Sequence, residues 1–325
     1  MKTARLEWFP YEVPLVEPLR IGAHRLATRR GVLVRATTEQ GAVGWGDAAP
    51  LPGFSRESAE DVQRELERGE GACSSSTRFA VESAVASASA AEAGVSLGSF
   101  LLGRTADHCA VNALIAEEPE AWADRACALV AEGFSVIKLK VGRAPMSLEL
   151  ACLRAAVEAA PGVRLRLDAN RAWSTLVARG FAQEVEGLPI AYIEEPVRAG
   201  CTISAEWPAS IPVAWDETLQ ETDAMPLAHE KVTTWVIKPT LAGGLTRAVR
   251  LVDEAAQRGV SVVFSSAYES GVGVRVLAEL AAATGGVAGL DTYRALAEDV
   301  LTPRLEMTGG VLDLRVARQR VVKIK

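Results

Sequence analysis

Charged and hydroxyl side chains follow several apolar runs in the second half of the chain. In chain order, the ends of these runs carry Lys138 and Lys140, Asp168 and Asn170, Glu194 and Glu195, Asp216 and Glu217, Lys238, and Ser265 and Ser266. A single acid at such a position is usually a turn or helix-capping residue. Acidic ends on three consecutive runs, with lysine ends before and after them, are not expected from independent turn preferences. The joint pattern therefore predicts a functional site.

Three carboxylates that converge from neighbouring strands form an oxygen-only site for a hard divalent cation. The chain has only three histidines, far apart, so zinc chemistry and Ser-His-Asp catalysis are disfavoured. We therefore expect Mg²⁺, with Mn²⁺ as a substitute. A lysine beside the cation can act as acid or base once burial and nearby positive charge lower its pKa. The cation itself stabilises the enediolate that forms when a bound carboxylate substrate loses its α-proton.

Eight strand-like runs alternate with helical patterns in this part of the chain. They lie at residues 109–115, 135–141, 163–168, 190–195, 211–217, 233–238, 260–266 and 286–291. Such alternation predicts a parallel sheet, and eight strands favour closure into a (β/α)7β barrel, whose active site lies at the carboxyl ends of its strands. Lys138 and Lys140 share one face of their strand and Leu139 takes the other, so we expect both lysines to point into the barrel.

Residues 1–108 lack the regular alternation of strands and helices, and their pattern predicts an α+β capping domain. A β-hairpin is expected at 30–50, with Gln40 and Gly41 near its turn, and helices at about 57–68 and 77–93. The tail at 309–325 alternates like strands. We predict that residues 300–325 complete the capping domain and that residues 109–299 form the barrel.

Composition indicates which cellular compartment and which classes of partner to expect. The net charge is −6 and the only short basic stretch is C-terminal, which argues against a nucleic-acid partner. The Ala/Ser-rich stretch 82–103 is interrupted by Glu92 and predicts a packed helix instead of a membrane span. No apolar segment of a signal peptide follows Lys2, and no cysteine pair has CxxC spacing. We expect a cytoplasmic protein with reduced core cysteines and a small-molecule carboxylate substrate. The oligomeric state stays open.

Seven motifs together resemble the enolase superfamily, in its muconate-lactonizing-enzyme-like subgroup, and within it the o-succinylbenzoate synthases. They are GWGDAAPLPGFSRES (44–58), IKLKVG (137–142), RLRLDANRAW (164–173), YIEEP (192–196), VAWDET (213–218), VIKPTLAGG (236–244) and FSSAYESGVG (264–273). The resemblance covers nearly the whole chain and implies the same capped (β/α)7β barrel. Sites of this superfamily pair a lysine or histidine base with Mg²⁺.

Carried onto this sequence, the resemblance implies a role for each charged residue. Asp168, Glu194 and Asp216 would be the metal ligands, with Glu195 and Glu217 as their supporting partners. Lys140 would remove the α-proton and then help hydroxide to leave. Lys138 would lower the pKa of Lys140, and Lys238 would stabilise the enediolate from the opposite face.

The resemblance also implies which residues meet the substrate. Arg166 and Asn170 would help to line the site. Ser265, Ser266 and the backbone near Gly289 would contact a succinyl tail. Residues 51–55 of the cap, with Phe54 among them, would close over the substrate and exclude water.

The implied reaction is β-elimination of water from 2-succinyl-6-hydroxy-2,4-cyclohexadiene-1-carboxylate, giving 2-succinylbenzoate for menaquinone synthesis. An N-acylamino acid or dipeptide racemase or epimerase of the same superfamily would use the same two lysines and is the alternative. A dipeptide epimerase is expected to carry an acidic pair after the eighth strand, where this chain offers only Asp291. A non-catalytic barrel is disfavoured because all of the key charges are present.

Overall fold

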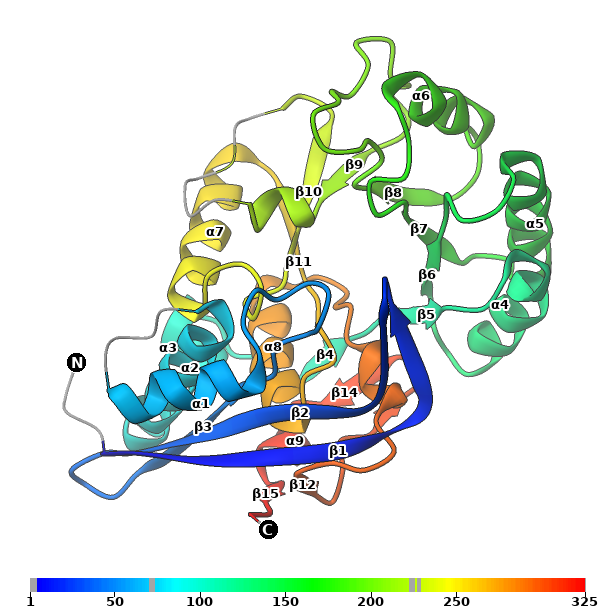
Figure 1. Ribbon diagram of the computed structural model, residues 1–325. Helices are drawn as coiled ribbons and strands as arrows, with labels where there is room; N and C mark the ends of the chain where they lie inside the picture. Colours follow the sequence, from blue (N-terminus) through cyan, green and yellow to red (C-terminus); the bar gives the residue numbers. More distant parts are fainter. Residues whose placement is uncertain (1–4, 70–73, 222–225, 227–228, 325) are drawn as a thin grey trace.

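A curled parallel sheet surrounded by helices forms one part of the molecule, and an antiparallel sheet with three helices forms the other (Figure 1). The computed structural model describes residues 5–69, 74–221, 226 and 229–324. The parallel sheet has the order β11-β10-β9-β8-β7-β6-β5. Its strands are β5 (Ala113–Ile115), β6 (Val136–Lys140), β7 (Arg164–Asp168), β8 (Ile190–Glu194), β9 (Val213–Trp215), β10 (Val232–Ile237) and β11 (Ser261–Phe264).

The two edges of this sheet are joined through residues 286–291. Parallel bridges link Ala288 to Val111 beside β5 and Gly289 to Ser265 beside β11. The amide of Gly289 donates to the Phe264 carbonyl at 2.9 Å. The prediction of an eighth regular strand is therefore wrong, although the segment occupies the expected place. The α/β class and the TIM-like (β/α)7β barrel are confirmed.

The predicted first strand, 109–115, is divided in two because the chain changes partner. β4 (His108–Ala110) pairs antiparallel with β14 (Val311–Asp313), whereas β5 pairs parallel with β6. Between them, Val111 donates its amide to the Gly310 carbonyl at 2.7 Å and Asn112 donates to Ala288 at 2.8 Å. The residues between the two strands thus connect the tail to the barrel.

Helices cover the outside of the barrel (Figure 1). They are α4 (Trp122–Ala131), α5 (Met146–Ala159), α6 (Thr175–Glu184), α7 (Leu245–Arg258) and α8 (Gly271–Thr284). α7 ends at Gly259, which caps the helix in the left-handed conformation with a φ of 67°. Residues 195–212, all described, contain no helix between β8 and β9. Three prolines in this segment, at 196, 208 and 212, disfavour helix propagation.

The N-terminal part contains both strands and helices, as predicted for an α+β unit. Its strands are β1 (Arg5–Ile21), β2 (His24–Thr37) and β3 (Val43–Ala48), and its helices are α1 (Ala59–Arg68), α2 (Ser75–Glu92) and α3 (Leu97–Leu102). The hairpin and both helices are confirmed within a few residues. Gly46 lets α2 lie directly on β3, because a Cβ there would come within 1.9 Å of the Ala80 carbonyl oxygen. Among the described residues, none of the helices has the length and apolar character needed to span a membrane.

The C-terminal tail contains a helix as well as strands. β12 (Leu301–Thr302) pairs with β15 (Val321–Val322), and β13 (Met307–Thr308) pairs with β14. Between β14 and β15 lies α9 (Leu314–Arg318), where alternation predicted strand. Asp313 explains the helix, since its carboxylate accepts the amides of Arg315 and Val316 as an N-cap. The division of the chain at residue 108 stays a prediction.

The described cysteines are free thiols, but they are not all in the core. Cys109 is buried, Cys152 and Cys201 are partly buried, and Cys127 is exposed. The expectation of a core position is therefore wrong for Cys127, which lies on the outer side of α4. Cys73 lies outside the described residues.

Candidate active site

The parallel register aligns the predicted site residues at one rim of the barrel. Lys140 at the end of β6 lies opposite Asp168 of β7, and Asp168 lies opposite Glu194 of β8. Asp216 directly follows β9. The three acids are 0%, 0% and 1% exposed, in that order. Buried carboxylates require partners, because an unpaired buried charge is strongly unfavourable.

Both lysines of β6 supply such partners. The Lys138 ammonium lies 2.7 Å from Glu194 Oε2 and 2.8 Å from Asp168 Oδ2. Lys140 lies 2.5 Å from Asp168 Oδ2 and donates to Asn170 Oδ1 at 2.9 Å. Leu139, between them, is 0% exposed on the other face of the strand. The inward orientation expected for the two lysines is confirmed.

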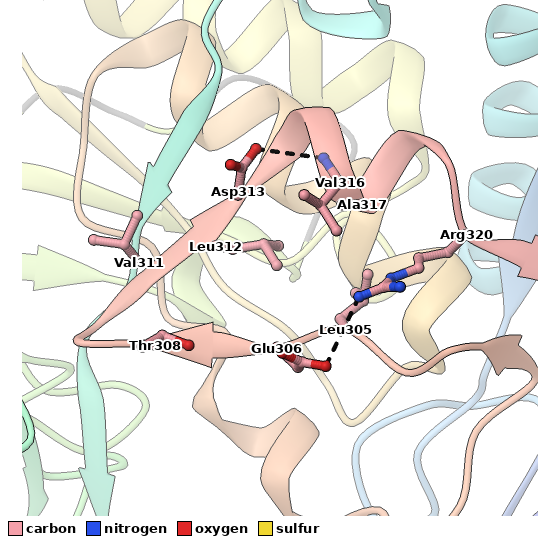
Figure 2. A pocket seen from close by; sticks show the side chains of 9 residues that line it. All are labelled: Leu305, Glu306, Thr308, Val311, Leu312, Asp313, Val316, Ala317 and Arg320. Atoms are coloured by element: carbon pink, nitrogen blue, oxygen red, sulfur yellow. Dashed lines mark hydrogen bonds and ion pairs between the residues drawn. The ribbon is translucent and has the colours of Figure 1, made fainter.

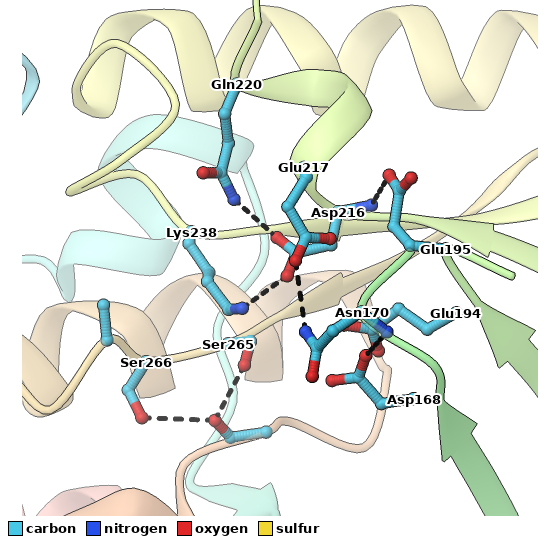
Figure 3. Close-up of polar contacts among 12 residues, drawn as sticks. Asp168, Asn170, Glu194, Glu195, Asp216, Glu217, Gln220, Lys238, Ser265 and Ser266 are labelled. Carbon is cyan, nitrogen blue, oxygen red and sulfur yellow. Dashed lines mark hydrogen bonds and ion pairs between the residues drawn. The ribbon is translucent and has the colours of Figure 1, made fainter. Parts of the chain in front are cut away.

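Lys238 reaches the same group of acids from the other side. It directly follows β10, and its ammonium donates to Asp216 Oδ2 (Figure 3). The second oxygen of Asp216 accepts the side-chain amide of Gln220 at 2.8 Å. Lys140 and Lys238 therefore approach a common space from opposite sides of the three carboxylates.

The electrostatics distinguish the two lysines of β6. Burial lowers the pKa of Lys140 below its ordinary value, and the charges of Lys138 and Lys238 lower it further against the opposing effect of Asp168. Burial also acts to lower the pKa of Lys138, but the charges of Asp168 and Glu194 outweigh it and hold this pKa well above the ordinary value. Lys138 is thus a fixed cation, whereas Lys140 is the more readily deprotonated of the two.

Glu195 points away from its neighbour Glu194 and braces the loops behind the site. Its Oε1 accepts the amides of Asp216 at 2.9 Å and Thr218 at 2.7 Å, and its Oε2 accepts Arg171 Nε at 2.9 Å. Glu195 has a φ of 42°, an uncommon conformation for a residue with a Cβ. Its carboxylate therefore fixes the backbone that presents Asp216.

The donor set fits a hard divalent cation. In the described part of the chain, no three acid, imidazole or thiol side chains lie together as a ready metal cluster. Lysine ammonium groups pair with the three carboxylates instead. Glu217 Oε2, however, is buried and finds no hydrogen-bond partner among the described residues. Burial and the Asp168 charge raise the pKa of Glu217. The acids thus retain acceptor capacity that oxygen-preferring Mg²⁺ or Mn²⁺ can use.

The residues expected to meet the substrate occupy different depths. Arg166 lies below the acids and is 6% exposed. It donates to Asn112 Oδ1 at 2.6 Å and to the Val287 carbonyl at 2.8 Å, and it stacks over the Tyr192 ring. Asn170 lies within the site and donates to Glu217 at 3.1 Å (Figure 3). Arg166 therefore supports the barrel interior beneath the charged layer.

The hydroxyls that follow β11 (Ser261–Phe264) and the cap segment lie around the same rim. Ser265 and Ser266 each donate to the Gly289 carbonyl at 3.2 Å, so the structure brings these three residues together. Phe54 is 42% exposed in its cap segment. Their roles toward a substrate stay predictions.

Sequence reasoning missed three polar residues that hold the site. Arg171 pairs with Glu195 and donates to Thr218 Oγ1 at 2.9 Å, and Gln220 supports Asp216. Arg171 stands within the DANRAW motif, which was the available signal. Thr218 likewise stands within the VAWDET motif, whereas Gln220, beside the short 3₁₀ turn η2 (Glu217–Leu219), carried no such signal.

A separate pocket of about 250 Å³ lies in the C-terminal segment (Figure 2). Its lining includes Leu305, Val311, Val316 and Arg320, all outside the barrel strands. The predicted catalytic residues are absent from this described lining, so the rim of the barrel remains the candidate active site.

Family comparisons cover most of the chain. Residues 121–317 match the model described as "Enolase C-terminal domain-like", and residues 1–96 match "MenC, N-terminal domain". The o-succinylbenzoate synthase of Yersinia pseudotuberculosis serotype O:1b (strain IP 31758) is 35% identical over 93% of this chain and 94% of that protein. The o-succinylbenzoate synthase of Klebsiella pneumoniae (strain 342) is 32% identical over 94% and 96%, respectively.

Solved structures share the fold. The L-Ala-D/L-Glu epimerase from Bacillus subtilis, in a substrate-liganded complex, superposes with a TM-score of 0.80 at 24% identity, covering 96% of each chain. The dipeptide epimerase from Enterococcus faecalis V583, complexed with Mg and a dipeptide, gives a TM-score of 0.81 at 21% identity over 96% of this chain and 97% of that one.

Proposed function

This chain belongs to the o-succinylbenzoate synthases of the enolase superfamily, and on that premise we propose how its residues divide the work of the reaction. The enzyme is a hydro-lyase that eliminates water from 2-succinyl-6-hydroxy-2,4-cyclohexadiene-1-carboxylate and forms 2-succinylbenzoate. The geometry that supports this activity best is the approach of Lys140 and Lys238 from opposite sides to buried carboxylates.

A divalent metal ion serves the reaction, and we propose that it is Mg²⁺, with Mn²⁺ as a substitute. Asp168, Glu194 and Asp216 would hold it, since they are the buried acids that meet at adjacent strand ends. When bound, the cation neutralises the substrate carboxylate and makes the α-proton more acidic. Glu195 would keep Asp216 in place through the Asp216 amide.

Lys140 is the proposed general base. Its Nζ takes the α-proton of the substrate, and the electron pair of the broken carbon–hydrogen bond moves into the carboxylate to give the enediolate. That pair then returns to form the new ring double bond as the carbon–oxygen bond breaks. The same ammonium returns the proton to the departing hydroxide, which leaves as water. Atoms and charge balance without an oxidant, and aromatisation of the ring favours product.

Lys138 and Lys238 are proposed to act through their charges. Lys138 stays protonated between Asp168 and Glu194 and keeps positive charge near Lys140. Lys238 would face the enediolate from the side opposite Lys140 and stabilise its negative charge. Neither needs to transfer a proton in the dehydration.

The succinyl tail is proposed to lie near Ser265, Ser266 and Gly289, with Arg166 and Asn170 shaping the site and Phe54 covering it. Support comes from the convergence of Ser265 and Ser266 on Gly289. We further propose that the enzyme works in the cytoplasm on this small-molecule carboxylate and that its product enters menaquinone synthesis.

An ultraviolet assay tests the function. Purified protein with Mg²⁺ is mixed with the cyclohexadiene substrate, and loss of the diene absorbance is followed with and without EDTA. Fast loss that EDTA abolishes and added Mg²⁺ restores supports the proposal. Absence of turnover by metal-loaded protein would refute it.

A dipeptide or N-acylamino acid epimerase is the second candidate, because lysines on opposite sides also suit proton exchange on two faces. Against this candidate, Asp291, at the end of residues 286–291, already has partners within the protein. It accepts the Leu114 amide at 2.8 Å and pairs with Arg294 at 3.0 Å. Incubation with dipeptides in deuterium oxide separates the two. Rapid α-deuterium incorporation would favour the epimerase, and none is expected.

A further inference from the structure

Arg29 of β2 is a buried cation that donates hydrogen bonds to three backbone carbonyls. The residue is 2% exposed. Its Nη1 donates to the Pro50 carbonyl at 3.0 Å and its Nη2 to the Ala49 carbonyl at 2.9 Å. Its Nε donates to the Tyr268 carbonyl at 3.1 Å. One planar side chain therefore joins three main-chain positions.

These carbonyls belong to two separate parts of the fold. Ala49 and Pro50 begin residues 49–55, hereafter the roof segment, which follows cap strand β3. Tyr268 lies in the turn between β11 and α8 of the barrel, with a φ of 62°. This left-handed conformation is uncommon for an aromatic residue and requires support from its surroundings. Arg29 supplies such support to the Tyr268 carbonyl.

The roof segment lies against the turns that follow barrel strands β10 and β11. Leu51 is 4% exposed and packs in one apolar cluster with Leu241 and Ala267. Leu241 donates its amide to the Lys238 carbonyl at 2.9 Å, so it is part of the turn that directly follows Lys238. Ala267 directly follows Ser266. The segment is therefore seated beside both the proposed electrostatic lysine and the proposed tail-binding hydroxyls.

The roof segment is also ordered within itself. The Leu51 carbonyl accepts the amides of Phe54 at 2.9 Å and Ser55 at 2.8 Å, and the Leu51 amide donates to Ser55 Oγ at 2.8 Å. A compact turn of this kind moves as a unit if its attachment is lost. Among the described contacts, the Leu51 cluster joins it to the barrel directly, and Arg29 joins it to the barrel turn at Tyr268.

We propose that Arg29 is a positioning residue for the dehydration: it clamps the roof segment onto the turn at Tyr268 and so fixes the cover of the active site. This inference rests on the proposed function for its catalytic consequence. Its structural content, the clamp itself, can be measured without turnover. The guanidinium suits this role because its donors diverge in one rigid plane, which a lysine ammonium does not reproduce.

The test compares Arg29→Met and Arg29→Lys with Arg30→Met as a matched control. Arg30 is the next residue on β2, but its side chain is 57% exposed and pairs with Glu12 and Glu60 at the surface. Two readouts are taken on each variant. Hydrogen exchange reports the amides of Phe54 and Ser55, and steady-state kinetics separate KM from kcat.

For Arg29→Met we expect exchange in the roof segment to accelerate at least tenfold, while β7 keeps its wild-type rate. KM for the cyclohexadiene substrate should rise about tenfold, with a smaller change in kcat. Arg29→Lys should give intermediate values, and Arg30→Met should match wild type. Saturating 2-succinylbenzoate should partly restore protection of the roof segment in Arg29→Met.

Wild-type exchange and unchanged KM in either folded Arg29 variant would overturn the proposal. Equal acceleration of exchange in β7 and the roof segment would do so as well, because it would indicate general destabilisation. If Arg29→Met does not fold, Arg29→Lys decides by the same two readouts. If the wild-type protein shows no turnover, that result counts against the proposed function. The hydrogen-exchange rates of the variants would still test whether Arg29 holds the roof segment.

Discussion

Asp47 of cap strand β3 holds Ser270, the N-cap residue of the barrel helix α8. Its Oδ2 accepts both the amide and the hydroxyl of Ser270 at 2.8 Å, and its Oδ1 accepts the Tyr11 hydroxyl at 2.9 Å. Asp47 is 0% exposed. A carboxyl group of the cap thus holds the N-cap residue of α8, and the Ser270 side chain in turn accepts the Val272 amide of the first helical turn.

This contact predicts a pH-dependent stability. Burial raises the pKa of Asp47 to about 7, despite its hydrogen bonds to Ser270 and Tyr11. The unfolded chain releases this proton near pH 4. Between about pH 4 and 7 the unfolded state therefore gains by ionisation while the folded state stays protonated. Protonated Asp47 therefore contributes fully to the free energy of unfolding below about pH 4. This free energy falls by up to about 4 kcal/mol as the pH rises from about 4 through 7.

Asp47→Asn should remove this slope, because asparagine keeps an acceptor for Ser270 without titrating. The free energy of unfolding is measured in urea at pH 5, 6, 7 and 8 for wild type, Asp47→Asn and the exposed control Asp253→Asn. The free energy of unfolding of Asp47→Asn, relative to that of wild type, should increase as the pH rises. Parallel curves would contradict the prediction.

Removing the charge of Lys140 or of Lys238 should strongly reduce turnover without unfolding the protein. Lys140→Met and Lys238→Met keep the aliphatic stems, while Asp168 retains Lys138 and Asp216 retains Gln220. We expect kcat to fall by roughly 10²–10⁴ for Lys140→Met, the range of general acid–base catalysis. Lys323→Met, an exposed control, should be unchanged in the diene assay. A Lys140→Met enzyme with wild-type kcat would exclude the proposed base.

The neighbours Glu194 and Glu195 should respond differently to the same substitution. Glu194 faces the lysines, whereas Glu195 braces the Asp216 and Thr218 amides. Calorimetric titration with Mg²⁺ should show at least a tenfold loss of affinity in Glu194→Gln and a smaller loss in Glu195→Gln. Glu195→Gln should instead lower the melting temperature more. Equal metal affinities in the two variants would contradict the proposed ligand set.

The alternation along β6 can be tested through stability. Leu139 is 0% exposed on the face opposite the two lysines, so Leu139→Ala should cost about 2–5 kcal/mol of unfolding free energy. Leu176 on α6 is 68% exposed, and Leu176→Ala should change stability by less than about 0.5 kcal/mol. Urea denaturation of both variants provides the measurement. Similar losses would show that the outer face of β6 is not tightly packed.

The sequence alone determined the elements whose signal is local. Strand-like runs that alternate with helical patterns predicted the parallel sheet, and the alternation of Lys138, Leu139 and Lys140 predicted which of these residues share a face. Parallel strands present their carboxyl ends at one rim. The acids and lysines could therefore be assigned to one site before their contacts were known.

The tertiary structure decided everything that depends on residues distant along the chain. It showed that residues 286–291 close the barrel by isolated bridges, because the chain there meets two strand edges without extending along either. It also separated Glu194 from Glu195, since a φ of 42° turns the second acid away from the lysines. Arg29 carried no signal of its own, because its three acceptors are backbone carbonyls, which every sequence contains, and only folding brings them together.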